Sequence, residues 1–196
     1  MVRAPPYNFG QLRAGSKALL AGSVASLGSH YAIGLNAVNC QTGDSLGSAQ
    51  AEADSREKIL TALGQAATTL RGKLGESLAS IQKFDKPLEE ATTSSLEALQ
   101  AYSEGIRQQE EKGDAAAVPY YKHAVELDPN FARAYAAIAV RYANLGQASL
   151  AIANSLKAYE LRNRVSQREN YYISAQYYTY VTGEVEKATE QYGLLV

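Results

Sequence analysis

The chain has 196 residues, which is enough for one medium-sized domain or two small ones with a buried hydrophobic core. Apolar residues make up 46% and charged residues 20%, which is ordinary for a globular protein and excludes a disordered or collagen-like chain. The 19 basic and 20 acidic side chains give a formal net charge of -1, so electrostatics gives no reason to expect a nucleic acid, an anionic membrane or a polyacidic substrate as the partner.

The first part of the chain is predicted to be a loop followed by a small α/β domain. Residues 1–11 contain a Pro-Pro pair and no periodic pattern, so we expect a loop or a frayed end. Three strands are expected over 19–27, 31–39 and 45–53, because short apolar stretches alternate there and turn signals separate them. Together with the helix that follows, they predict a small and incomplete α/β domain over residues 12–75.

That helix is expected to begin at Asp54 or Ser55. Asp54 and Glu57 have the spacing of a capping box, and apolar residues then recur at three- and four-residue steps as far as Leu74. Gly75 suits the left-handed position that follows a helix end. Residues 76–93 have one proline and no sustained period, and we predict a packed linker there.

The remainder of the chain, residues 94–196, contains an internal repeat of helix-turn-helix segments. Ser94 and Glu97 form a second possible capping box at its start. Self-comparison aligns three segments on Gly113, Gly146 and Gly183, which are 33 and 37 residues apart. Small residues beside the glycines let two helices of a hairpin approach closely, while tyrosine and leucine fill the space beside them.

This spacing resembles the tetratricopeptide repeat (TPR), whose unit is about 34 residues long. The resemblance covers residues 94–196, although tryptophan is absent and Ser155 stands where an aromatic residue is usual. It implies about three helical hairpins that form a short right-handed solenoid. The fold class expected for the whole chain is therefore α+β, with a small α/β N-terminal piece, a β-meander plus a helix, followed by an all-α TPR solenoid.

In this repeat family the first helix of each hairpin contributes to an inner, concave wall that binds a protein segment or peptide. Tyrosines crowd residues 171–180, and tyrosine combines apolar area with one hydroxyl group, which suits a recognition groove. The alternative, that these tyrosines pack against a further repeat, is equally compatible with the sequence. The residues that the resemblance places on the wall are Tyr102, Ile106, Arg133, Ala136, Val140, Asn144, Asn170, Ile173, Tyr177 and Tyr180.

Residues 17–46, 74–105 and 164–178 resemble one bacterial arrangement more closely. They are similar to the C-terminal, sensor-side region of large membrane-anchored Ser/Thr protein kinases of the acidobacterial type, in which a small α/β domain precedes a TPR array. The kinase motifs themselves, the glycine-rich loop, HRD and DFG, are absent from this chain. The resemblance therefore implies the architecture and a sensing or protein-binding role, without kinase activity.

Three features could indicate catalysis or metal binding, and each has a simpler interpretation. Residues 10–17 approach a P-loop, but serine and lysine stand in the reverse order. Cys40 and His30 could form a thiol–base pair, yet they lie at opposite ends of one predicted strand, roughly 30 Å apart. His123 has no second histidine four residues away. We expect no enzymatic activity, no cofactor and no metal.

The sequence thus predicts a non-catalytic protein–protein interaction module, part of the sensor or scaffold of a larger signalling protein. One alternative is a small enzyme or ligand-binding domain in the α/β half. Another is self-assembly into a homo-oligomer through the apolar C-terminal edge, residues 194–196, since a solenoid end without a polar cap needs cover, unless the chain is a fragment.

No apolar run approaches the roughly 18 residues of a membrane span, and the N-terminus has no apolar signal-peptide region, so we expect no membrane insertion by this chain. The location remains open from sequence. It is the cytoplasm for this chain alone, and the extracytoplasmic side of the inner membrane for a part of the resembled kinase.

Overall fold

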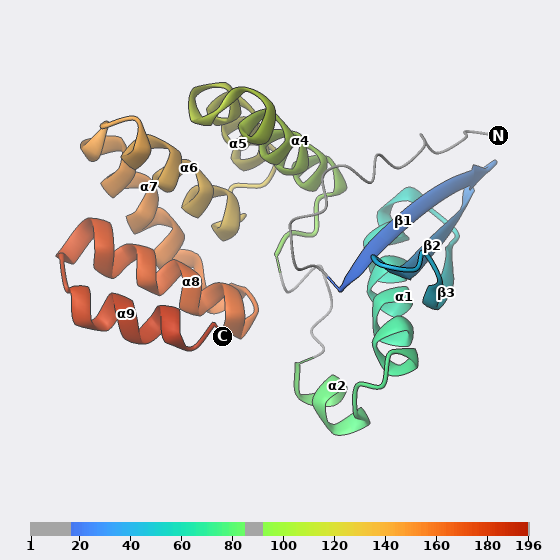
Figure 1. The fold of residues 1–196 in the computed structure, drawn as a ribbon. Helices are drawn as coiled ribbons and strands as arrows, with labels where there is room; N and C mark the ends of the chain where they lie inside the picture. The colour runs from blue at the N-terminus through green and yellow to red at the C-terminus, as the bar shows by residue number, and fades with distance from the viewer. Residues whose placement is uncertain (1–16, 85–91, 196) are drawn as a thin grey trace. The chain divides into compact units, whose positions relative to one another are not determined.

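The computed structural model describes residues 17–84 and 92–195, which fall into two compact units with a boundary between residues 87 and 88 (Figure 1). The loop expected over residues 1–11, nearly all of the P-loop-like segment, and residues 85–91 of the expected linker lie outside the described residues. Each unit is described by itself.

The first unit is built on a three-stranded antiparallel sheet in the order β1-β2-β3, which confirms the predicted meander. Its strands are β1 (Ala18–Leu27), β2 (His30–Asn39) and β3 (Ser45–Ala53). Gly28 takes a φ of 66° in the two-residue turn between β1 and β2, a conformation that glycine adopts without steric cost.

The helix α1 (Ile59–Lys73) packs against β2 and β3, as Figure 1 shows. The core between them consists of short and branched side chains: Leu35, Ala37, Ala49, Ala66 and Leu70. The helix does not cover β1. Leu20 and Val24 of β1 pair with the inward-facing Ala37 and Ile33 of β2. Their side chains nevertheless remain 61% and 60% exposed.

The start of this helix differs from the expected capping box. A short 3-10 turn, Arg56–Lys58, precedes α1, and neither end of that turn carries a side-chain cap. The Asp54 carboxylate instead accepts a hydrogen bond from the Lys58 ammonium group at 2.9 Å. A further short helix, α2 (Leu78–Phe84), lies within the segment expected as a linker.

The second unit consists of helical hairpins, in agreement with the predicted repeat (Figure 1). Consecutive helices pack as the pairs α4–α5, α6–α7 and α8–α9. The predicted turn glycines Gly113, Gly146 and Gly183 all have a positive φ, which confirms their place between paired helices. The helices are α4 (Leu96–Lys112), α5 (Asp114–Leu127), α6 (Ala132–Asn144), α7 (Ala148–Leu161), α8 (Gln167–Tyr177) and α9 (Val185–Gly193).

Serine side chains cap the first helix of two hairpins. The Ser95 hydroxyl accepts from the Ala98 amide at 3.1 Å, so the cap of α4 lies one residue after the predicted Ser94. The Ser166 hydroxyl accepts from the Glu169 amide at 3.3 Å and starts α8 in the same way.

The packing within and between hairpins relies on small residues, as the repeat pattern predicted. Gly105 of α4 lies so close to the Tyr121 ring of α5 that an added Cβ would be 2.6 Å from it. The boundary between the second and third hairpins is filled by Ala132, Ala136, Ala158, Leu161, Val165 and Ile173. Such alanine-rich contacts bring helix axes close together.

Candidate ligand-binding site

Two of the residues expected on a concave wall belong to the core. Ala136 and Ile173 are 0% exposed and pack against each other's hairpins, so neither side chain is available to a ligand. Val140 is half-buried on α6, and Ile106 is exposed on α4. Ala136 and Ile173 were expected on the wall, but they belong to the core that holds α6 and α8 together.

Asn144 of α6 forms a hydrogen bond to the preceding hairpin. Its amide nitrogen donates to Asp114 of α5 at 2.7 Å, and the same carboxylate forms an ion pair with Arg141 at 3.0 Å. These contacts join the end of α6 to the start of α5. Asn144 thus has a structural role that the repeat alignment did not indicate.

Tyr177 of α8 faces α7, and Asn170 of α8 faces the 3-10 turn Arg162–Arg164 that follows α7, which corrects their expected place on the wall. The Asn170 amide donates to the carbonyl oxygen of Arg162 at 2.9 Å. The Tyr177 ring stacks on Tyr159 of α7 with centroids 3.8 Å apart. The physical reason is the insertion between α7 and α8, because a helix turns about 100° per residue and a small change of alignment moves a side chain to another face.

The structure places Tyr102, Arg133 and Tyr172 close together. The Tyr102 hydroxyl is near enough to Arg133 to favour the charged form of its guanidinium, whose carbon lies 3.8 Å from the centroid of the Tyr172 ring. Burial raises the pKa of Tyr102, whose ring lies 5.2 Å from Tyr121 and 5.1 Å from Phe131 between centroids.

Glu169, in the first turn of α8, completes this group and was not singled out by the sequence. Burial raises its pKa to about 7, while the charge of Arg133 and a hydrogen bond from Thr92 act in the opposite direction. Its Oε2 atom is buried and accepts no hydrogen bond from any described residue. A carboxyl group with this pKa changes its protonation state close to neutral pH.

An open hollow of about 360 Å³ lies beside these residues. Arg133, Arg168, Glu169, Tyr172 and Leu195 line it. Arg168 is exposed and forms no ion pair with another described residue. Tyr180 belongs to the same neighbourhood, since burial raises its pKa and the nearby Tyr172 and Arg141 also influence it. The hollow therefore combines two guanidinium groups, one carboxyl group and an aromatic face.

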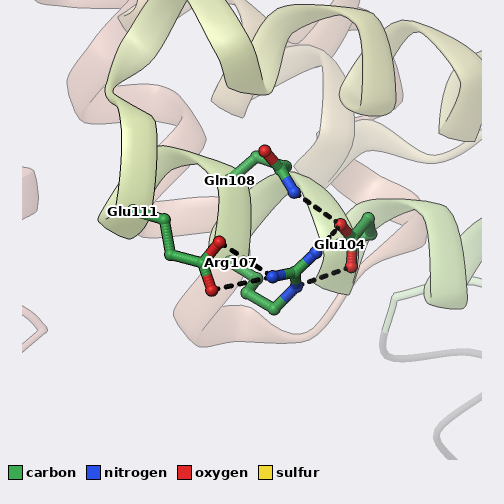
Figure 2. A network of polar contacts seen from close by, with 4 residues as sticks. All are labelled: Glu104, Arg107, Gln108 and Glu111. Carbon is green, nitrogen blue, oxygen red and sulfur yellow. Dashed lines mark hydrogen bonds and ion pairs between the residues drawn. The ribbon is translucent and has the colours of Figure 1, made fainter.

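A second polar cluster, on α4, lacks the features of a binding site. Figure 2 shows Arg107 between Glu104 and Glu111, with the Gln108 amide donating to Glu104 at 2.8 Å. The hydrogen bond from Arg107 lowers the pKa of Glu104 to about 2. Because these side chains satisfy one another along a single helix, their contribution is to the stability of α4.

The described part of the α/β unit has open hollows of its own. One, of about 420 Å³, lies on the sheet and is lined by apolar and uncharged polar residues of all three strands. Another, of about 410 Å³, is lined by charged and polar residues that include His30, Glu52, Asp54 and Lys58. The partly buried Cys40 directly follows β2 and His30 begins that strand, as expected. Within the part of the chain that the structure describes, no three histidine, cysteine, aspartate or glutamate side chains are grouped to hold a metal ion.

No described helix combines the length and the hydrophobicity that crossing a membrane would require. No model of a protein family matches the chain, and no curated protein matches it either. Among solved structures, the chain is similar to the second TPR domain of Spaghetti (RPAP3) bound to the HSP90 peptide SRMEEVD. The two are 19% identical with a TM-score of 0.40, over 51% of this chain and 90% of that chain.

Proposed function

We propose that the helical unit is a non-catalytic TPR-type module that binds a segment of another protein across α6 and α8. The observation that carries this proposal is the arginine–tyrosine contact between Arg133 and Tyr172 at the edge of an open hollow. Arginine and tyrosine are enriched at the energetic centres of protein interfaces, because each combines apolar contact area with directed hydrogen bonds.

The partly buried state of these side chains supports a recognition role. Arg133 is held between Tyr102 and Tyr172, so its rotamer is largely fixed before any ligand arrives. A preorganised side chain loses less conformational entropy on binding than a free surface arginine. The neighbouring Arg168 and Glu169 supply hydrogen-bonding groups that fix the orientation of a bound segment.

The place of this module in a larger protein is a further proposal. The resemblance of residues 17–46, 74–105 and 164–178 to kinase sensor regions supports a sensor or scaffold role in signalling, on the extracytoplasmic side of a membrane-anchored protein. In such a protein, occupancy of the helical unit would be the signal. The α/β unit would connect the module to the rest of the chain.

Selection from a random peptide library displayed on phage tests the binding function. Enriched peptides should bind the full chain, and Arg133→Gln should weaken that binding at least about tenfold, as for an interface hot spot. Arg107→Gln is the matched control, because Arg107 lies in the separate network on α4. Equal binding by both variants, or no enrichment from the library, would contradict the proposal.

A second candidate function is self-assembly through α9. Val185 and Leu194 at the two ends of this helix are 66% and 53% exposed, and Tyr192 is 40% exposed. Such an apolar edge can be buried against a second copy. Light scattering over a tenfold concentration range tests this: a mass that rises with concentration and returns to the monomer value in Val185→Lys supports it, and a constant monomer mass excludes it.

A further inference from the structure

The described residues that line the hollow between α6 and α8 carry an excess of positive charge. Arg133 reaches it from α6 and Arg168 from α8, while Glu169 is the one acidic side chain among its described lining residues. The excess is one charge when Glu169 is ionised and two when it is protonated. Leu195 and the face of Tyr172 form apolar walls that reduce the screening of these charges by water.

The two guanidinium groups retain donors for a ligand. Arg133 uses its planar face against Tyr172 and lies near the Tyr102 hydroxyl, which leaves N–H groups at the edge of the guanidinium. Arg168 is exposed and has no ion-pair partner among the described residues. Planar guanidinium edges match the paired oxygens of carboxylate and phosphate groups.

We propose that this hollow binds an oxyanion, a carboxylate or phosphate group of the partner, and that a proton is taken up by Glu169 when the anion binds. The inference rests on the proposed function and specifies the chemistry of the ligand. Arg133 and Arg168 donate to the anion. The protonated Glu169 places a neutral carboxyl group beside it, so the described lining residues then carry two positive charges toward the anion.

Proton uptake follows from the surroundings of Glu169. An ionised carboxylate would repel an incoming anion in a partly dehydrated site, whereas a protonated one can donate a hydrogen bond to it. The described groups that face Glu169 are Arg133 from α6, Tyr102 from α4, Thr92 before α4, and Arg168 and Tyr172 from α8 itself. Arginine and tyrosine side chains do not ordinarily titrate between pH 6 and 8.5, so Glu169 alone changes charge there.

The expected pH dependence has a definite sign. Because burial raises the pKa of Glu169 in the free protein to about 7, the proton is already present at pH 6 and must be taken up at pH 8. Affinity for the anion should be nearly constant below about pH 6.5. It should fall by about tenfold per pH unit above pH 7, the slope for uptake of one proton.

Titration of the full chain with sulfate tests the site, because sulfate keeps its double charge over this pH range. Binding followed by NMR should show the Kd rising above pH 7 in the wild type. Glu169→Gln should bind sulfate at pH 8.5 with the Kd that the wild type has at pH 6, without pH dependence. Arg133→Gln and Arg168→Gln should weaken binding at least about tenfold at every pH, whereas Arg107→Gln should leave it unchanged. The gain by Glu169→Gln at high pH is a result that a misfolded variant cannot mimic.

Acetate and methyl phosphate, titrated in parallel at pH 6, distinguish a carboxylate from a phosphate as the preferred group. No binding of any of these anions at pH 6, or binding that is unaffected by Arg133→Gln, would overturn the anion site. An unchanged pH slope in Glu169→Gln would overturn proton uptake by Glu169. Peptides from the library that require Arg133 but do not compete with the anions would leave the proposed function standing and refute only this inference.

Discussion

The guanidinium carbon of Arg133 lies 3.8 Å above the ring of Tyr172, and this contact joins α6 to α8. The same guanidinium interacts electrostatically with the hydroxyl of Tyr102 on α4. One side chain thus contacts the first helix of all three hairpins. Since each hairpin in a repeat protein is stabilised by its neighbours, such a residue couples the stability of the hairpins to the geometry of the ligand site.

Tyr172→Leu should destabilise the helical unit by roughly 1–2 kcal/mol, through loss of the cation–π contact and of aromatic packing. The measurement is urea denaturation followed by circular dichroism. Tyr171→Leu is the matched control, because Tyr171 accepts a hydrogen bond from Gln167 of its own helix and lies beside the contact with Arg133 rather than in it. Equal losses in both variants would show that the Arg133 contact contributes nothing specific.

The elements of the fold were largely predictable, because local signals determine them. The apolar alternation of β2 produced a strand of nearly the expected length, and Gly113, Gly146 and Gly183 occupy the turns that the repeat alignment assigned to them. Glycine at a turn and alternation in a strand act within a few residues. They therefore remain readable without knowledge of the tertiary structure.

The ligand site was predictable only in part, because it depends on how α8 is rotated. Tyr102 and Arg133 were expected on the wall and do meet. Gly146 and Gly183 are four residues further apart than Gly113 and Gly146, and this difference shifts the alignment of the third repeat. Tyr172, which was not among the expected wall residues, therefore contacts Arg133, whereas Tyr177 faces α7. Glu169 has no sequence signature, since its raised pKa results from burial by residues distant in the chain.

Glu169 should make the stability of the helical unit depend on pH. Its pKa of about 7 in the folded state exceeds the ordinary value near 4.3 in the unfolded chain, so stability is highest below about pH 4.5 and is lost as the pH rises to 7. The loss is on the order of 3 kcal/mol, and no further loss is expected above pH 7.5. The free energy of unfolding, measured in urea at pH 5 and pH 8, checks this.

Glu169→Gln is the control for this pH dependence, because the amide has a similar shape and does not ionise. The variant should be more stable than the wild type at pH 8 and nearly equal to it at pH 4.5. Glu104 does not disturb the comparison, since its pKa is lowered to about 2 and its effect falls below pH 4.5. The same change of stability with pH in both proteins would refute the assignment to Glu169.

Asn144→Ala should lower stability by about 1 kcal/mol and leave the affinity for selected peptides within about twofold. The reason is its hydrogen bond to Asp114, which joins α6 to α5 within the fold. Thermal unfolding and peptide titration measure the two effects separately. Asn154→Ala provides a comparison, because among the described residues Asn154 bonds only to the Leu150 carbonyl of its own helix. If the variant instead bound the selected peptides more weakly and kept its stability, Asn144 would be a residue of the ligand site.

Gly105→Ala should destabilise the first hairpin although alanine is the better helix former. A methyl group at this position would be 2.6 Å from the Tyr121 ring, which is itself 2% exposed and has no room to move away. The helix-propensity gain of about 1 kcal/mol is smaller than the cost of forcing α4 and α5 apart, so the net loss should be about 1–3 kcal/mol. Gly193→Ala is the matched control, because nothing lies within 4 Å of an added Cβ there. The free energy of unfolding of both variants, measured in urea, tests this prediction. A Gly105→Ala variant that is more stable than the wild type would show that α4 and α5 are not packed at the close distance that the glycine permits.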